Sequence, residues 1–163
     1  MYAVMFESDN NGKLLITCPD LPEVTSFGAD EEEAMQRAVN AIEEALATRI
    51  EHDEDIPTPS AAADRRSTVP GPPRRIRSPI AAGLPRANRR MVRLTPLTKA
   101  KVELYRAMHT DGISKAELAR RLSLDDRSVD RLLRLSYRSR IELIDHALRA
   151  IGKRLDVIVL DEA

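Results

Sequence analysis

The residues best suited to chemistry are arginines and small polar side chains between positions 120 and 134. Arg127 and Arg131 lie four residues apart, so on a helix they share one face. A guanidinium can donate two hydrogen bonds to O6 and N7 of guanine, the commonest specific contact between protein and DNA. The spacing therefore indicates a surface that reads DNA.

The segment 113–135 must position these side chains, and it predicts two short helices joined by a tight turn, a helix-turn-helix. Apolar residues recur at helical spacing in each half, so the two apolar faces can pack together. Ser114 followed by Glu117 is a capping box for the first helix, and Asp125 can cap the second. Ser123 occupies a turn position where glycine is common, so we expect it to take a positive φ.

In such a motif the first residues of the second helix face base edges, whereas flanking cations contact phosphates. The predicted base-facing residues are Asp126, Arg127, Ser128 and Arg131. The rest of the predicted DNA-binding set is Ser114, Arg120, Arg121 and Arg134. A basic helix face is often only solvated, which is the alternative interpretation. The caps, turn spacing and apolar pattern together favour DNA binding.

Charge is distributed unevenly along a chain whose overall net charge is zero. Residues 1–60 contain 3 Lys and Arg against 14 Asp and Glu, residues 61–90 contain 8 against 1, and residues 91–163 contain 15 against 11. DNA phosphates would repel so acidic a first part. That part therefore needs a different partner, and a basic one would suit it.

The first 60 residues predict a β-β-β-α unit. The runs 2–6 and 14–18 form a hairpin around Asn11–Gly12, and 24–28 offers a third short strand. Asp30 caps a following helix, with Glu33 completing a capping box. The apolar face of this helix can cover the sheet.

A connector and a helical region follow. Residues 61–90 contain five prolines and eight arginines and little to bury, so we expect a disordered or extended linker. Segment 91–94 has strand character and could join the first sheet, a point that the sequence leaves open. Thr98 begins a helix that ends at Gly112.

The end of the chain predicts one more helix and a strand. Ser139 and Glu142 form a cap for the helix, and Gly152 ends it. Residues 154–160 read as a strand, which we expect to pair with a second copy or with the first sheet, because a lone strand is a pairing liability. Pairing between copies favours a dimer, which a palindromic operator would also require.

Several function classes are disfavoured. Cys18 is the single cysteine, so neither a disulfide framework nor a cysteine metal site is expected. Nothing in the pattern joins the histidines into a triad or the early acids into a metal site; these are His52, His109, His146, Glu7, Asp9 and Asp20. We predict no enzyme activity, no metal and no cofactor. No apolar run is long enough to span a membrane and no signal segment precedes the first strand, so we predict a cytoplasmic protein.

The chain resembles a HicB-type antitoxin of a type II toxin–antitoxin system. The first part carries the resemblance in YAVMFE, LLITCPDLPEV, FGAD and EEEAMQRAVNAIEEAL. The second part, LTKAKVELYRAMHTDGISKAELARRLSLDDRSVDRLLRL with ALRAIGKRLDVIV, is similar to members that carry a helix-turn-helix. The linker is longer and richer in Arg and Pro than in that family.

The resemblance implies an α+β protein with three parts. Residues 1–60 would be a partial ribonuclease H-like domain, with strand 91–94 as an open addition; 61–90 would be the linker, and 95–163 the all-α DNA-binding and dimerisation domain with its terminal strand. The first domain would neutralise a small basic HicA toxin, an mRNA endoribonuclease. The second would repress the shared operon as a homodimer or higher oligomer on operator DNA. Toxin contacts are predicted at Asp20, Glu23, Glu31 and Glu32.

Two other functions compete with this one. The chain could be a dimeric transcription regulator whose first domain senses a ligand or mediates oligomerisation. A ribonuclease H-like first domain could also be a nuclease, but that would require carboxylates converging on divalent ions, which nothing in the spacing provides.

Overall fold

The computed structural model describes residues 1–9, 12–60 and 88–158. The chain divides into two compact units: Met1–Leu46 with Pro57–Leu94, called the sheet unit, and Ala47–Ile56 with Thr95–Ala163, called the helical unit. The expected mixed α+β class is confirmed. Most of the expected linker, residues 61–87, lies outside the described residues.

The sheet unit contains a four-stranded antiparallel sheet. Its strands are β1 (Tyr2–Ser8), β2 (Leu14–Thr17), β3 (Thr25–Gly28) and β4 (Arg89–Val92), in the order β3-β2-β1-β4. Tyr2 pairs with Val92, which answers the question left open for the fourth strand. The strand begins two residues earlier than segment 91–94, so the last residues of the expected linker are part of the sheet.

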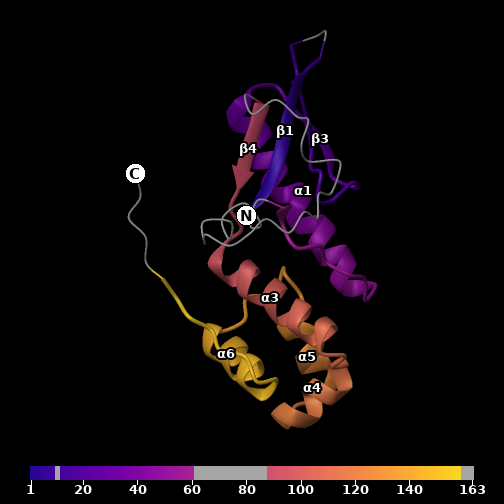
Figure 1. Ribbon diagram of the computed structural model, residues 1–163, viewed down its shortest axis with the longest axis vertical. Helices are drawn as coiled ribbons and strands as arrows, with labels where there is room; N and C mark the ends of the chain where they lie inside the picture. The colour runs from indigo at the N-terminus through magenta and orange to yellow at the C-terminus, as the bar shows by residue number, and fades with distance from the viewer. Residues whose placement is uncertain (10–11, 61–87, 159–163) are drawn as a thin grey trace, which may run out of the picture. The chain divides into compact units, whose positions relative to one another are not determined.

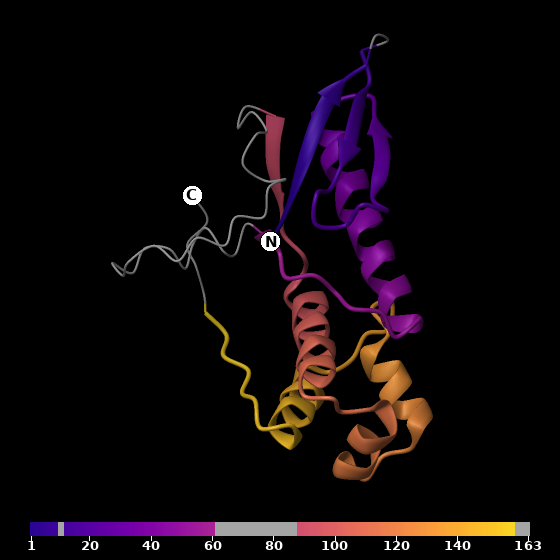
Figure 2. The same cartoon turned by 45° about the vertical axis from the view of Figure 1, so that its right-hand side comes forward.

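Helix α1 (Glu31–Glu51) runs along one face of this sheet (Figures 1 and 2). Gly28 permits the close approach, because an added Cβ there would lie 2.5 Å from the backbone nitrogen of Ala34. The helix begins as predicted: Asp30 Oδ1 accepts a hydrogen bond from the Glu33 amide at 2.9 Å. The Glu33 carboxylate accepts from the Ala29 amide at 2.7 Å, one residue before the expected partner.

The helical unit contains α3 (Pro96–Thr110), α4 (Lys115–Leu122), α5 (Asp126–Leu133) and α6 (Ile141–Ala150). Its core consists of fully buried side chains from all four helices, including Leu104, Leu118, Leu132 and Ile144. Packing against α3 and α6 therefore fixes α4 and α5. Among the described residues, no helix combines the length and apolar character needed to cross a membrane.

Two predicted helix starts are wrong. Helix α3 begins at Pro96, because Thr95 caps it by accepting a hydrogen bond from the Thr98 amide at 3.2 Å and proline suits the first helical position. Helix α6 begins after Arg140, which provides no side-chain cap. Ser139 therefore lies one residue too early to cap it, and its buried hydroxyl has no hydrogen-bond partner.

The predicted pairing of the terminal strand with the first sheet is wrong for the residues that can be described, whereas its pairing with a second copy stays a prediction. Residues 154–158 form no strand, and Val157 and Ile158 are each 78% exposed. A strand is stable only when another strand supplies hydrogen bonds, and no described segment of this chain pairs with these residues. Residues 159 and 160 lie outside the described part.

Candidate functional sites

The turn between α4 and α5 has the geometry that the sequence predicts. The Ser114 hydroxyl caps α4, accepting from the Glu117 amide at 3.1 Å. Ser123 takes a left-handed conformation, with φ 54° and ψ 40°, and so turns the chain. Asp125 caps α5, accepting from the Ser128 amide at 3.1 Å, and hydrogen bonding to Ser128 lowers the pKa of Asp125. These local contacts position the start of α5.

Glu117 has a different role from the one expected. Its carboxylate does not return to the cap amide but accepts hydrogen bonds from Arg121 Nε at 2.7 Å and from Arg120 Nη2 at 2.7 Å. Hydrogen bonds from these two guanidinium groups lower the pKa of Glu117. Both predicted phosphate contacts on α4 are therefore held by one carboxylate.

The predicted base-facing residues all lie in the first two turns of α5. Asp126, Arg127 and Arg131 are exposed and Ser128 is half-buried. Arg131 Nη2 donates to the Ser128 hydroxyl at 3.1 Å. Arg127 has no side-chain partner among the described residues. The structure thus gathers this set on one short helix, with Arg127 open to a ligand.

Sequence reasoning missed a buried cation next to this helix. Lys101 on α3 is fully buried, and its Nζ donates to the carbonyl oxygens of Arg134 at 2.6 Å and Tyr137 at 2.5 Å. Burial lowers the pKa of Lys101 to about 8. Arg134 is the C-cap residue of α5, so this lysine fixes the backbone where the chain leaves the helix. The sequence feature that could have indicated its burial is its position among the apolar residues Ala100, Val102 and Leu104.

The four predicted acidic contacts on the sheet unit occupy two places. Asp20 and Glu23 lie in the turn before β3, whereas Glu31 and Glu32 follow it, so the pairs lie at opposite ends of this strand. Asp20 accepts hydrogen bonds from Ser60, at 3.1 Å from the amide nitrogen. Glu31 binds Arg90 of β4, at 2.5 Å between Oε1 and Nε, and this hydrogen bond lowers the pKa of Glu31.

Glu32 is the most available of these four acids. It is exposed and has no side-chain partner among the described residues. It borders a shallow hollow on α1, which is also lined by Glu31, Met35, Gln36 and Val39. The hollow combines an acidic end with two half-buried apolar side chains.

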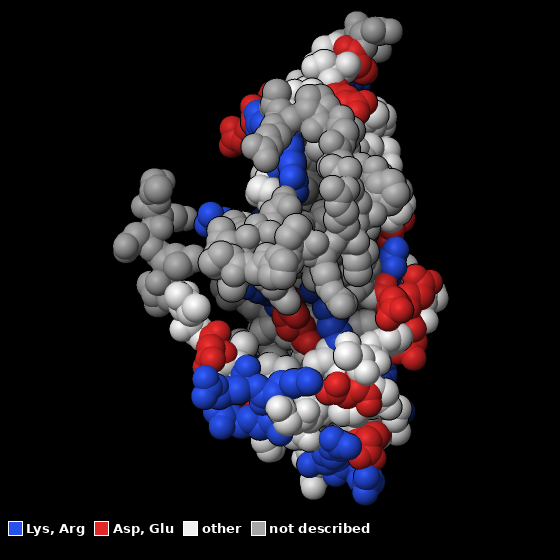
Figure 3. Space-filling model, in the orientation of Figure 1, with Lys and Arg blue, Asp and Glu red and all other residues white. Residues whose placement is uncertain are grey.

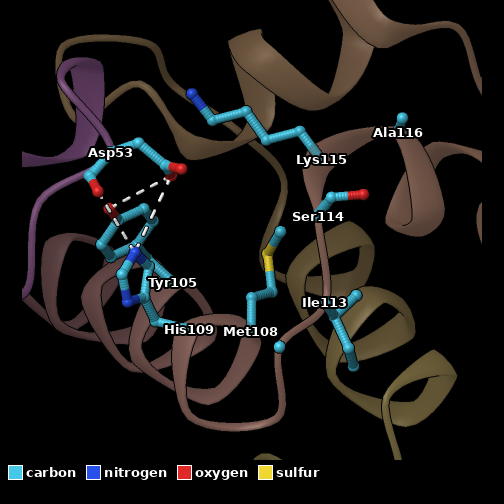
Figure 4. Close-up of a pocket in the computed structure, with 9 residues that line it drawn as sticks. Asp53, Tyr105, Met108, His109, Ile113, Ser114, Lys115 and Ala116 are labelled. Carbon is cyan, nitrogen blue, oxygen red and sulfur yellow. Dashed lines mark hydrogen bonds and ion pairs between the residues drawn. The ribbon is translucent and has the colours of Figure 1, made fainter.

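A pocket of about 530 Å³ lies in the helical unit, where Asp53, Tyr105 and His109 gather beside Met108 (Figure 4). The Tyr105 hydroxyl donates to the Glu54 carbonyl at 2.9 Å, and burial is the largest cause raising the pKa of Tyr105 to about 12. His109 Nδ1 lies 2.9 Å from Asp55 Oδ1. These contacts tie the loop after α1 to α3, a pairing that the sequence did not reveal. No metal-binding group of His, Cys, Asp or Glu occurs among the described residues.

Comparison with known proteins decides which family the chain represents. It is 32% identical over 158 residues to Antitoxin HicB of Pseudomonas fluorescens (strain Pf0-1), covering 94% of this chain and 93% of that protein. The chain belongs to the HicB antitoxin family. The family model described as HicB-like antitoxin of bacterial toxin–antitoxin systems matches residues 1–72.

Other HicB relatives align over similar lengths. Antitoxin HicB 2 of Photorhabdus laumondii subsp. laumondii is 31% identical over 98% of this chain and 96% of its own. Antitoxin HicB of Escherichia coli (strain K12) is 26% identical over 98% of this chain and 99% of its own. These proteins are named as antitoxins, so the comparison confirms that the chain is not an enzyme and implies a toxin partner.

Proposed function

We propose that this HicB protein neutralises a HicA-type endoribonuclease toxin with its sheet unit and represses its own operon with its helical unit. The observation that carries the proposal is the capped α4–turn–α5 arrangement with an exposed arginine face, in a chain that aligns with antitoxins over almost its whole length. An antitoxin with such a unit can hold a toxin and DNA at once.

The toxin side of the proposal rests on charge and shape in the sheet unit. We assign a partial ribonuclease H-like fold to this unit, in which α1 covers one face of the antiparallel sheet. Glu31 and Glu32 at the start of α1, with Asp20 and Glu23, contact the toxin. Acidic surfaces attract a small basic partner and exclude acidic ones.

The DNA side rests on the helix-turn-helix interpretation of α4 and α5. Helix α5 enters the major groove, where Arg127 and Arg131 read guanine and Asp126 and Ser128 adjust the choice of base. Ser114, Arg120, Arg121 and Arg134 contact the backbone. A homodimer or higher oligomer places two such helices on the halves of a palindromic operator.

Co-expression with the product of the adjacent gene, which we expect to be a small basic protein, tests the toxin side. We expect the two proteins to copurify and the complex to leave labelled RNA intact where the free partner cleaves it. A partner that neither copurifies nor cleaves RNA would contradict this half of the proposal.

Fluorescence anisotropy with DNA from upstream of the gene tests the operator side. We expect tighter binding to this DNA than to a scrambled fragment of the same length. Equal affinity for the two would instead favour a regulator of another kind, or an antitoxin that does not control its own transcription.

A further inference from the structure

The turn between α5 and α6, residues 134–140, carries a positive charge that its own surroundings do not neutralise. Its sequence is RLSYRSR, with three arginines and no acid. Arg134, Arg138 and Arg140 are exposed, and none has a side-chain partner among the described residues. We call residues 134–140 the arginine turn.

Apart from Arg127 and Arg131 on α5, the arginines of α4, of α6 and of the segment after α6 are compensated. Arg120 and Arg121 bind Glu117, Arg149 binds Asp145 at 2.8 Å, and Arg154 binds Asp156 at 2.9 Å. Figure 3 shows lysines and arginines gathered over α4 and α6, where such pairs also occur. Since a carboxylate already occupies these guanidinium groups, the arginine turn is the stronger site for an external anion.

The arginine turn is also held in one conformation. Besides the two bonds from Lys101, the Tyr137 amide donates to the Arg134 carbonyl at 3.2 Å, and the Ser139 amide donates to the Tyr137 carbonyl at 3.0 Å. Tyr137 is 47% exposed, and its ring centroid lies 5.9 Å from Lys101 Nζ. A fixed backbone means that the arginines lose less freedom on binding.

We propose that the arginine turn is a DNA-backbone clamp, in which Arg138 and Arg140 bind phosphates next to the segment read by α5. The inference rests on the proposed DNA-binding function and adds residues outside the helix pair to it. The turn begins at Arg134, the C-cap residue directly after α5, so it follows that helix onto the duplex without an intervening segment. Guanidinium forks match phosphate oxygens, and such contacts position a recognition helix without reading sequence.

The salt dependence of DNA binding tests the clamp, with the full-length chain and two double variants. Each phosphate contact contributes about 0.9 to the slope of log K against log salt. For Arg138→Ala with Arg140→Ala, we expect the slope to fall by roughly 2 on upstream and on scrambled DNA alike. The matched control, Arg149→Ala with Arg154→Ala, removes the same charge from paired positions and should change the slope much less.

Three results would overturn the clamp. The slope could stay unchanged, or it could fall equally in the control variant. The slope could also fall on upstream DNA alone, which would indicate a base contact. If the slope stays but the oligomer size changes, the turn contacts an acidic surface of another copy and the clamp is also wrong. The proposed function fails separately, if wild-type protein does not prefer upstream DNA. In that case, the clamp is still tested by comparing the slope of the double variant with that of the wild type on scrambled DNA.

Discussion

The sheet unit and the helical unit differ in which charged side chains are paired and which remain available. In the sheet unit, Glu31 and Glu33 at the start of α1 are paired with arginines, while Glu32 remains available. In the helical unit, acids three or four residues away hold most arginines of α4 and α6, and the available ones lie on α5 and in the arginine turn. Net charge therefore tells less about a binding surface than the few charges that folding leaves uncompensated.

Gly28→Ala should destabilise the sheet unit and leave the helical unit folded. The added methyl would meet the backbone of Ala34, which cannot move away as a side-chain end could. We expect the free energy of unfolding of this unit to fall by about 3 kcal/mol and toxin neutralisation to weaken with it, while DNA binding persists. Urea unfolding measures the loss. Gly12→Ala, in open space but at φ +77°, should cost only about 1 kcal/mol.

Arg131→Ala probes the helical unit alone. If this arginine reads guanine, affinity for upstream DNA should fall by about 1 to 3 kcal/mol and base preference should blur, as anisotropy titrations would show. Arg149→Ala is the control, because that arginine holds Asp145. An equal loss on scrambled DNA would make Arg131 a phosphate contact.

Glu32→Lys tests whether an uncompensated acid marks the partner surface of the sheet unit. Reversing the charge opposite a basic toxin should weaken the complex about tenfold, measured by calorimetry. Glu44→Lys makes the same change at another exposed position of α1. If both variants bind equally well, the toxin contacts lie elsewhere.

The buried Lys101 should make stability depend on pH. Its pKa is near 10.5 when solvated and about 8 when folded, so between these values the unfolded chain binds more protons. Stability therefore rises with pH in this window. Relative to Lys101→Met, the wild type should gain about 1 kcal/mol between pH 8.5 and 9.5 in urea unfolding. A difference independent of pH would show that the lysine titrates normally.

Ser123→Gly should produce the smallest effect. Glycine adopts the left-handed conformation without the steric cost that serine bears, but it adds freedom to the unfolded chain. We expect a net gain of about 0.5 kcal/mol in unfolding free energy with unchanged DNA affinity. Lower stability would mean that the serine side chain contributes to the turn.

The sequence by itself determined the features that depend on neighbours within four residues. The caps at Ser114, Asp30 and Asp125 and the left-handed Ser123 could be predicted, because each satisfies backbone groups of its own turn. The apolar periodicity likewise predicted the strands and helices. Two helix starts were placed wrongly: α3 is capped by Thr95 rather than begun by Thr98, and α6 begins after Arg140 without the expected cap from Ser139.

Only the tertiary structure decided which distant groups meet. Strand β4 pairs with β1 across more than 80 residues, Lys101 reaches carbonyls 33 and 36 residues away, and His109 meets the loop after α1. Residues 154–158 form no strand within one chain for the same reason, since a strand exists only with a partner. Local sequence patterns indicate which secondary structure each segment can form. Which contacts form depends on the free energy of burial and pairing, and those contacts decide which charges remain available for binding.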